Sequence, residues 1–342
     1  VYVTDLDRGR RIGTMDDYEK LLKLSQSCHA LHFAAWEQVT AQDVPVNVRH
    51  LHRVRAGLTL TDKVVMEGAH GRIITADTLA MMRLVYDTLD GDPVTGDVIN
   101  VNSPLRYDER MLGGLITYAR AGQVTFITPF ILAGAMSPVT MAAALAQQNA
   151  EVLAGAALTQ LVRPGAPVIY GGFTTHIDLR NGSPAFGTPE GAWAALVGGQ
   201  LARRYGLPYR GSGGLTTSKA ADAQSAYESL WSLWPAVLAH TNLIMHAAGW
   251  IDGGLTVSFE KFVIDLENLA IAHPAVANAA VIGVRHPKWD ERPLLIVVRK
   301  PGAELTREDL LKFYEGKIAK WWLPDDVQFL SLIHISEPTR PY

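Results

Sequence analysis

Short apolar runs of strand length alternate with longer amphipathic segments along most of this chain. The strand-like runs are Ala30–Trp36, Lys63–Glu67, Asp97–Asn102, Gln123–Pro129, Pro167–Phe173, Leu207–Arg210, Asn242–Ala248 and Thr256–Phe262. The amphipathic segments between them include Thr75–Leu89, Leu105–Arg120, Pro138–Leu161, Pro189–Tyr205 and Ser218–Ala239. Strands that alternate with helices in this way predict βαβ units and a parallel sheet.

Eight strands over roughly 250 residues match the count and length of a (β/α)₈ or TIM barrel, and we predict this α/β fold. An open doubly wound sheet is the alternative, and it is less favoured because no GxGxxG sequence follows an early strand. In a barrel the active face lies at the carboxyl ends of the strands. The residues expected there are Trp36, Glu37, Glu67, Asn102, Thr128, Pro129, Gly172–Thr174, Arg210, His246 and Glu260.

Composition excludes several classes of protein. A formal net charge of -3 over 342 residues gives no electrostatic footprint for nucleic acid or for an anionic membrane surface. The single cysteine, Cys28, excludes a disulfide framework and fits a reducing cytoplasm, where we expect the protein to reside. No apolar run approaches the roughly 20 residues that are needed to span a bilayer.

The stretch Leu207–Lys219 (LPYRGSGGLTTSK) predicts a short strand, a glycine-rich turn and a helix that starts near Lys219. An ordinary βα turn, with glycines placed for positive φ, explains this pattern. Lys219 lacks the GxxxxGK[ST] spacing, so a P-loop is not supported.

Arg210 and His246 each fall at the end of a predicted strand, next to small or apolar residues. An arginine in that position can clamp a carboxylate in bidentate fashion, and a histidine can complete the clamp. The alternative is that both residues are structural: the arginine would pair with a nearby acid, and the histidine would form a hydrogen bond with the backbone. The sequence leaves both interpretations open.

No other group of polar or charged residues in the sequence indicates a functional site. Five residues have spacings that occur in metal sites: Cys28, His29, His32, His50 and His52. A zinc site would need further ligands, and the sequence has no second cysteine, so we predict no metal site. No spacing selects a carboxylate pair among Glu67, Asp108, Glu109, Glu190, Asp252 and Glu260. Thr188 and Pro189 instead predict a helix start, and the helical spacing of Trp231 and Trp234 predicts core positions. Catalytic residues therefore stay unknown.

From about Asp5 to Asp265 the chain resembles the trimethylamine methyltransferase family, which are corrinoid-dependent enzymes of the TIM-barrel fold. The matching stretches are HFAAWEQVTAQDVP, PVIYGGFTTHIDLRNGSPAFGTPEGA, YGLPYRGSGGLTTSKAADAQSAYES and LIMHAAGWIDGGLTVSFEKFVID. The N-terminal part and the C-terminal tail of the family have no counterpart here, so the resemblance implies a barrel that is truncated at both ends. Exposed surface at such truncations favours aggregation or oligomer contacts.

The resemblance implies methyl transfer from a quaternary or tertiary amine to the Co(I) of cobalamin carried by a separate corrinoid protein. Such catalysis depends on positioning and on the exclusion of water, and it requires no acid–base triad. A methylammonium head suits aromatic surfaces, and Trp36, Tyr107 and Phe130 are candidates for that contact.

Trimethylamine enzymes of the family carry pyrrolysine in the loop before the Thr-x-Ser-Lys segment, where this chain has Leu215. The chain therefore resembles the branch without pyrrolysine, which includes glycine betaine demethylases. In that branch an arginine and a histidine hold the substrate carboxylate, and Arg210 and His246 fall at the matching places. The resemblance implies a betaine-like substrate.

Past Asp265 the sequence changes character. Two short β runs, Ala280–Val284 and Pro293–Val298, and a helix over Glu308–Lys320 introduced by Thr306 predict a small α+β unit. From Leu266 to Phe329 the chain resembles the C-terminal subdomain of an acyl-CoA synthetase, in LENLAIAHPAVANAAVIGVRHPKWDERPLLIVVRKPGAELTREDLLKFYEGKIAKWWLPDDVQF. The catalytic-lysine loop and the large AMP-binding domain of that family have no counterpart in the sequence.

The last segment, Leu330–Arg340 (LSLIHISEPTR), resembles neither family and is similar to a translated sequencing adapter. We therefore expect a chimera of three parts: a barrel domain over 1–265, an α+β fragment over 266–329 and an artefactual or disordered tail over 330–342. The join is expected near Ile264–Glu267, and a natural fusion is the alternative. Besides methyl transfer, an acyl-CoA ligase fragment and a non-catalytic amine-binding barrel stay open as functions.

Overall fold

The computed structural model describes residues 1–28, 31–271, 276–286, 290–299, 304–314 and 326–329. The chain divides into two compact units, and each is described by itself. The first unit comprises Val1–Gln26 and His32–Asp265, and the second comprises Ser27–Leu31 and Leu266–Tyr342.

The main sheet of the first unit is mostly parallel. It consists of β5 (Gly96–Val101), β6 (Val124–Ala133), β7 (Val168–Gly171), β8 (Phe173–Ile177), β9 (Pro184–Ala185), β10 (Tyr209–Ser212) and β11 (Leu243–Met245). Strands β5, β6, β7, β10 and β11 pair side by side in chain order, and β8 continues along the second half of β6. Parallel neighbours need a crossover each, and helices supply these crossovers.

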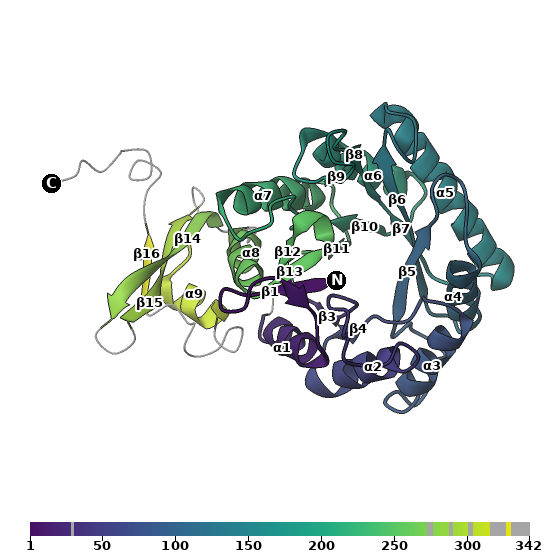
Figure 1. Ribbon diagram of the computed structural model, residues 1–342, viewed down its shortest axis with the longest axis horizontal. Coiled ribbons are helices and arrows are strands. Elements are labelled where there is room, and N and C mark those ends of the chain that lie inside the picture. The colour runs from purple at the N-terminus through teal and green to yellow at the C-terminus, as the bar shows by residue number, and fades with distance from the viewer. Residues whose placement is uncertain (29–30, 272–275, 287–289, 300–303, 315–325, 330–342) are drawn as a thin grey trace. The chain divides into compact units, whose positions relative to one another are not determined.

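The helices of the first unit lie outside the strands (Figure 1). They are α1 (Met15–Gln26), α2 (Arg49–Leu60), α3 (Arg72–Met82), α4 (Glu109–Arg120), α5 (Met141–Val162), α6 (Pro189–Arg204) and α7 (Ala223–Leu238), with α8 (Phe259–Ile271) continuing past the end of the unit. The prediction of a mixed α/β fold with parallel strands is confirmed. Helices α1 and α2 were not predicted.

Two smaller sheets complete the first unit. Strand β3 (Phe33–Ala35) pairs in parallel with β4 (Val64–Val65). In the other sheet the order is β12 (Trp250–Ile251), β13 (Thr256–Ser258), β1 (Tyr2–Thr4) and β2 (Arg11–Ile12), with a short 3₁₀ turn, η1 (Asp252–Gly254), between β12 and β13. Because β1 pairs with β13, segments from the two ends of this unit meet in one sheet.

Side chains replace a strand ladder between β4 and β5. The hydroxyl of Thr95 donates to the carbonyl of Val65 at 2.9 Å, and the backbone N–H of Ala69 donates to Asp97 at 3.1 Å. Within the part of the chain that the structure describes, the sheets do not join into one ring. A closed eight-stranded barrel is therefore not observed.

The sequence predicted the start of one helix correctly and misplaced the start of another. Thr188 is the N-cap of α6 and accepts from the N–H of Gly191, with Pro189 in the first turn, as predicted. Helix α7 starts later than predicted, at Ala223 instead of Lys219, because Asp222 forms a capping box with Ser225. The last predicted strand is also too long, since the chain becomes helical at Phe259.

The prediction of Trp231 and Trp234 as core residues is wrong. Both lie on α7, but their exposed fractions are 52% and 47%. The buried face of this helix carries Ser229, Leu233 and Ala236 instead. Helical spacing predicts that residues share a face, and it does not tell which face packs inward.

The second unit contains β14 (Val276–His286), β15 (Asp290–Arg299), α9 (Arg307–Tyr314) and β16 (Asp326–Phe329). Strands β14 and β15 pair antiparallel, and β16 joins β15 in parallel. The two predicted strands are confirmed within longer ones. At the start of α9, Thr306 and Asp309 bond each other's backbone N–H as predicted for a cap, whereas the end of the predicted helix, up to Lys320, lies outside the described residues.

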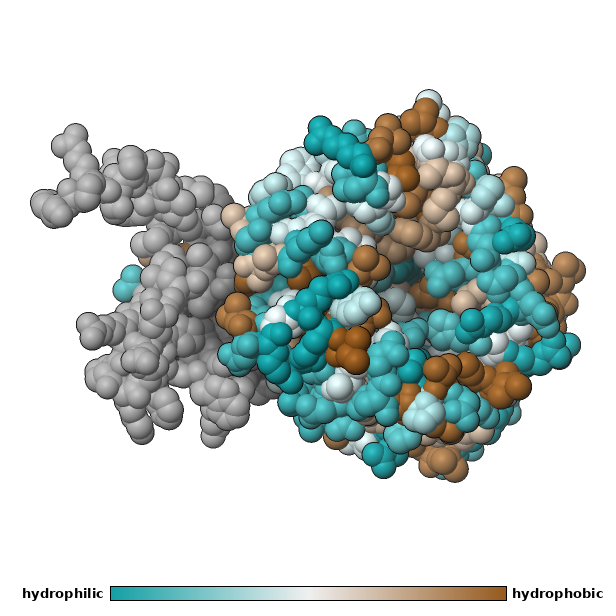
Figure 2. Space-filling model, in the orientation of Figure 1, coloured by the Kyte–Doolittle hydropathy of each residue, from teal (hydrophilic) through white to brown (hydrophobic). Residues whose placement is uncertain are grey.

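The surface of the first unit mixes polar and apolar side chains on the face shown in Figure 2. In the helices that the structure describes, none combines the length and the hydropathy that a bilayer-spanning segment needs.

Candidate functional site

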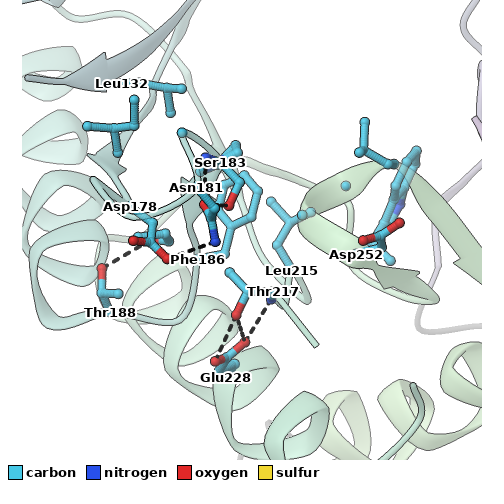
Figure 3. A pocket seen from close by; sticks show the side chains of 18 of the residues that line it. Leu132, Asp178, Asn181, Ser183, Phe186, Thr188, Leu215, Thr217, Glu228 and Asp252 are labelled. Atoms are coloured by element: carbon cyan, nitrogen blue, oxygen red, sulfur yellow. Dashed lines mark hydrogen bonds between the residues drawn. The ribbon is translucent and has the colours of Figure 1, made fainter. Parts of the chain in front are cut away.

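A cavity of about 1290 Å³ lies in the first unit beside β6, β8 and β9 (Figure 3). The turns after β10 and β11 contribute Leu215 and His246 to its wall, and β12 contributes Trp250. Three phenylalanines line it as well, namely Phe130, Phe173 and Phe186. The cavity therefore has an aromatic wall with a histidine in it, at the strand ends where the sequence predicts a site.

His246 lies inside a box of aromatic rings. It stacks on Phe173 with the ring centroids 5.2 Å apart, and it meets Trp36 at 5.3 Å and Trp250 at 5.0 Å edge to face. Burial, together with the charge of Arg210, holds the pKa of His246 well below its usual range. The imidazole is therefore neutral at physiological pH. Its φ of 55° is a left-handed conformation, which is uncommon outside glycine.

Arg210 on β10 is 1% exposed. Its Nε lies 3.1 Å from the sulfur of Met245, and its Nη1 lies 3.4 Å from the carbonyl oxygen of Gly172. The guanidinium also lies 5.2 Å from the ring centroid of Phe173. Among the described residues no carboxylate forms an ion pair with it. Burial lowers the pKa of Arg210 to about 10, because none of these neighbours replaces its hydration.

Parallel pairing of β10 with β11 brings the two sequence-predicted residues together. Arg210 aligns with Leu243 and Ser212 with Met245, so the end of β10 lies next to His246. The hydroxyl of Ser212 is 2.5 Å from Nδ1 of His246. Sequence reasoning did not identify Ser212, and strand register is the only information that could have found it.

The turn after β10 is fixed against the turn after β11. Gly214 has φ 63°, and a Cβ there would lie 2.5 Å from the carbonyl oxygen of His246. Only Gly214 among the three glycines of the turn uses a positive φ. This close approach requires glycine and places Leu215 in the cavity wall.

A buried lysine braces the same turn. Nζ of Lys261, on α8, donates to Ser229 at 2.7 Å, to the carbonyl of Gly214 at 3.3 Å and to Asp265 at 2.6 Å. Asp265 in turn accepts the backbone N–H of Gly249 at 2.8 Å. We call Lys261 and Asp265 the α8 brace, since together they tie α7 and both turns of the site to one helix.

Glu228 on α7 holds the next residues of the turn. Its carboxylate accepts from Thr216 at 2.6 Å and from the backbone N–H of Thr217 at 2.7 Å, as the dashed lines at Thr217 show in Figure 3. Both carboxylate oxygens are used within the protein. Glu228 thus supports the cavity wall.

A second group of charges lies around Arg53 on α2, and we call it the Arg53 cluster: Glu37, Arg53, Glu67 and His70. Arg53 bonds Glu37 at 2.8 Å and also bonds Glu67. His70 lies 2.6 Å from the other oxygen of Glu37. Burial opposes the charge of Arg53, but the two carboxylates outweigh it and raise its pKa. Burial raises the pKa of Glu67 to about 8.

Asp97 connects this cluster to the aromatic box. It accepts from Nε1 of Trp36 at 3.0 Å and from the N–H of Ala69. Burial raises the pKa of Asp97. Trp36 is thereby held with its ring against His246.

The structure brings five of the six sequence-predicted contact residues to one region and leaves one out. Arg210, His246, Trp36, Phe130 and Leu215 are in the cavity wall or directly behind it. Tyr107 does not line this cavity, and its hydroxyl donates to the carbonyl of Glu151 at 2.6 Å. Sequence reasoning missed Phe173 and Trp250 as ring partners of His246.

In the described part of the chain, no three histidine, cysteine or acidic side chains are placed so that they could hold a metal ion. His50 instead meets Asp77 at 3.0 Å. His29 lies outside the described residues.

Comparison with known proteins gives two separate matches. Residues 2–284 match the family model "Trimethylamine methyltransferase (MTTB)", and residues 265–336 match "AMP-binding enzyme C-terminal domain". The second match starts one residue before the predicted start of the synthetase-like segment and runs beyond its predicted end at Phe329.

Three curated relatives represent these matches. Glycine betaine methyltransferase of Desulfitobacterium hafniense is 40% identical over 78% of this chain and 56% of its own length. Proline betaine:corrinoid methyltransferase of Eubacterium limosum is 27% identical over 75% of this chain and 55% of its own length. For the C-terminal part, 3-methylmercaptopropionyl-CoA ligase of Ruegeria lacuscaerulensis is 53% identical over 21% of this chain and 14% of its own length.

The chain thus spans little more than half the length of the methyltransferase relatives. The family model nevertheless covers most of the chain, including every residue of the aromatic box, Arg210 and the α8 brace. The C-terminal part carries a second family's sequence. By its larger part, the chain belongs to the trimethylamine methyltransferase family.

Proposed function

We propose that the first unit binds a betaine, an amino acid with a quaternary or tertiary methylated nitrogen, and passes one methyl group to a corrinoid on a separate protein. The observation that carries this proposal is Arg210, a buried arginine with no carboxylate partner among the described residues. We further propose that the unit is a (β/α)₈ barrel over 1–265, followed by a synthetase-like part over 266–329 and a tail over 330–342.

A buried guanidinium without a counter-ion is costly, since even after relaxation the loss of hydration costs several kcal/mol. Here the available acceptors are a thioether sulfur, one carbonyl oxygen at 3.4 Å and the face of Phe173. A ligand carboxylate would supply the missing charge and two acceptor oxygens. His246 is beside it and can add a further hydrogen bond, which supports a carboxylate as the group that is recognised.

The methylated end of a betaine would lie among aromatic rings. Phe130, Phe173 and Trp250 line the cavity, and Trp36 lies against His246. Aromatic faces attract a quaternary ammonium group, which cannot donate hydrogen bonds. Carboxylates at the cavity wall are already bonded within the protein, as Glu228 is, so the rings are the groups left to recognise the cation.

The chain's own contribution to methyl transfer would be binding, orientation and the exclusion of water. The reduced corrinoid supplies the nucleophile. Fixing the carboxylate on Arg210 leaves the N–CH₃ bond as the free end of the ligand, and a rigid turn held by the α8 brace keeps that geometry constant. No side chain has to move a proton, which is consistent with a site whose histidine stays neutral.

Titration calorimetry tests the ligand. We expect glycine betaine to bind, and 3,3-dimethylbutanoate, a carboxylate of the same shape without the positive charge, to bind more weakly. Choline, which keeps the cation and lacks the carboxylate, should also bind more weakly. Arg210→Ala should lose binding of betaine by a factor of about 30 or more, the usual effect of removing a buried charge partner. Equal binding by wild type and Arg210→Ala would contradict the proposal.

Transfer of a labelled methyl group from betaine to reduced cobalamin then separates an enzyme from a non-catalytic amine-binding barrel. Label in methylcobalamin is expected for the enzyme only. Acyl-CoA ligation is the second candidate function, since the C-terminal part is 53% identical to a ligase over 73 residues. The match covers 14% of that ligase, so we expect no adenylate formation from this part alone.

A further inference from the structure

Ser212 and His246 form a close polar contact beside the aromatic rings, and their arrangement determines where the imidazole proton lies. Ser212 Oγ is 2.5 Å from Nδ1 of His246. Which atom donates decides whether the other ring nitrogen, Nε2, offers a proton or a lone pair to the cavity.

The ring is neutral, because burial removes the water that would hydrate an imidazolium and the neighbouring charge of Arg210 disfavours a second proton. Phe173, Trp36 and Trp250 surround it with rings, and Arg210 adds a positive charge. The acids that line the cavity are engaged elsewhere within the protein. Asp178 accepts from the N–H of Arg180, Glu228 accepts from Thr216 and Thr217, and Asp252 pairs with Arg10 at 3.3 Å.

A neutral imidazole has one donor and one acceptor nitrogen. Within the described residues, Nδ1 of His246 is the only hydrogen-bond partner of the Ser212 hydroxyl. If Nδ1 donated, the hydroxyl proton would have no acceptor among the described residues, whereas a hydroxyl that donates to Nδ1 satisfies both groups. The hydroxyl therefore donates to Nδ1, and the ring proton is on Nε2.

We propose that Ser212 is a positioning residue that fixes His246 as the Nε2–H tautomer, so that the ring donates one hydrogen bond to the ligand carboxylate beside Arg210. The identity of the ligand rests on the proposed function, whereas the tautomer does not. Nε2 has no partner among the described residues, and His246 lines the cavity. In the opposite tautomer the Nε2 lone pair would face the carboxylate and repel it.

The distance between Ser212 and His246 is similar to that between a catalytic serine and its general base, but their chemistry differs. An imidazole next to Arg210 is a weak base, and a serine whose proton is already held by that weak base is poorly activated. The arrangement supports binding of an anion by a neutral donor. Over pH 6–8 that binding would take up no proton.

Nitrogen NMR of protein labelled with ¹⁵N in histidine tests the tautomer without any ligand. The His246 signals are assigned by their loss in His246→Gln, since the chain has 11 histidines. We expect a protonated Nε2 and an unprotonated, hydrogen-bonded Nδ1 between pH 6 and 8. Nδ1–H or imidazolium at pH 7 in the wild type would overturn the proposal.

Two variants at position 212 complete the test. Ser212→Thr keeps the hydroxyl and should keep the Nε2–H signal, whereas Ser212→Ala should give a mixture of tautomers and weaken betaine binding about two- to tenfold. An unchanged tautomer in Ser212→Ala would refute the role of Ser212. If the wild type does not bind betaine but shows the Nε2–H signal, the proposed ligand fails and the tautomer assignment stands.

Discussion

Two buried arginines in the first unit have opposite surroundings. Arg53 and Arg210 are 3% and 1% exposed. Arg53 binds the carboxylates of Glu37 and Glu67, and these raise its pKa. Arg210 meets a sulfur, a carbonyl and an aromatic ring, and burial lowers its pKa to about 10.

We infer from this difference that Arg53 stabilises the fold, and that Arg210 has the role in ligand binding that we propose for it. Acidic residues of the protein neutralise the charge of Arg53, so removal of Arg53 leaves these two acids without a cation partner. The charge of Arg210 is not neutralised by any described residue, so its removal takes away a cost of folding. Burial alone does not distinguish these roles, and the identity of the partners does.

The largest expected effect is on stability at the Arg53 cluster. Above pH 8, where Glu67 is ionised, Arg53→Met should lower the free energy of unfolding by about 3–5 kcal/mol, because buried Glu67 and half-buried Glu37 would lose their shared cation. Urea denaturation followed by circular dichroism measures this. A loss below about 1 kcal/mol would mean that the cluster is not a structural unit.

The pH dependence of stability gives the next effect. The pKa of Glu67 is about 8 in the folded protein and near 4.5 in the unfolded chain, so the folded state binds the extra proton between these values. Stability should therefore fall as pH rises from 4.5 to 8, by up to about 1.4 kcal/mol per pH unit. Glu67→Gln should remove this slope. Parallel stability curves for wild type and variant would contradict the assignment.

Arg210→Met provides the matched control for Arg53→Met. Its free energy of unfolding should stay within about 1 kcal/mol of the wild type or increase, because a hydrophobic side chain replaces an uncompensated charge. Betaine binding should nevertheless be lost. If Arg210→Met destabilised the protein as much as Arg53→Met does, the contrast between the two arginines would be wrong.

The smallest effect is expected at Asp97, which links the two regions. Asp97→Asn removes the charge and keeps an acceptor for Trp36, and betaine binding should weaken about threefold. Trp36→Phe keeps a ring and removes the N–H. Calorimetry of both variants and of the double variant should show non-additive losses, and fully additive losses would exclude a shared hydrogen bond.

Local sequence patterns predicted where helices and strands lie better than they predicted which side of a helix is buried. The alternation of apolar runs located β5, β6, β7, β10 and β11, and Thr188 located the start of α6. The same periodicity placed Trp231 and Trp234 in the core, although α7 turns them outward. It also overlooked β1 and β2, which are too short to show a pattern.

The site could be predicted only where residues are close in sequence to a strand end. Arg210 and His246 fulfil that condition, and strand pairing brings them together. Glu37 and Glu67 of the Arg53 cluster were expected at strand ends, whereas Arg53 lies on α2, a helix that the sequence pattern did not predict. Tyr107 was predicted as a ligand contact only because it has an aromatic ring, and its hydroxyl donates a hydrogen bond to the backbone carbonyl of Glu151.

The α8 brace also limits where the first unit can be cut. Lys261 is fully buried, and Asp265, its counter-ion, is the last residue of that unit. A shortened protein that ends at Asp265 keeps the pair, whereas one that ends at Ile264 leaves an ammonium group in the interior without its acid. We expect the same boundary for gene fusion: a junction directly after Asp265 keeps the pair, whereas a junction that replaces Asp265 removes the acid that bonds Lys261 and Gly249.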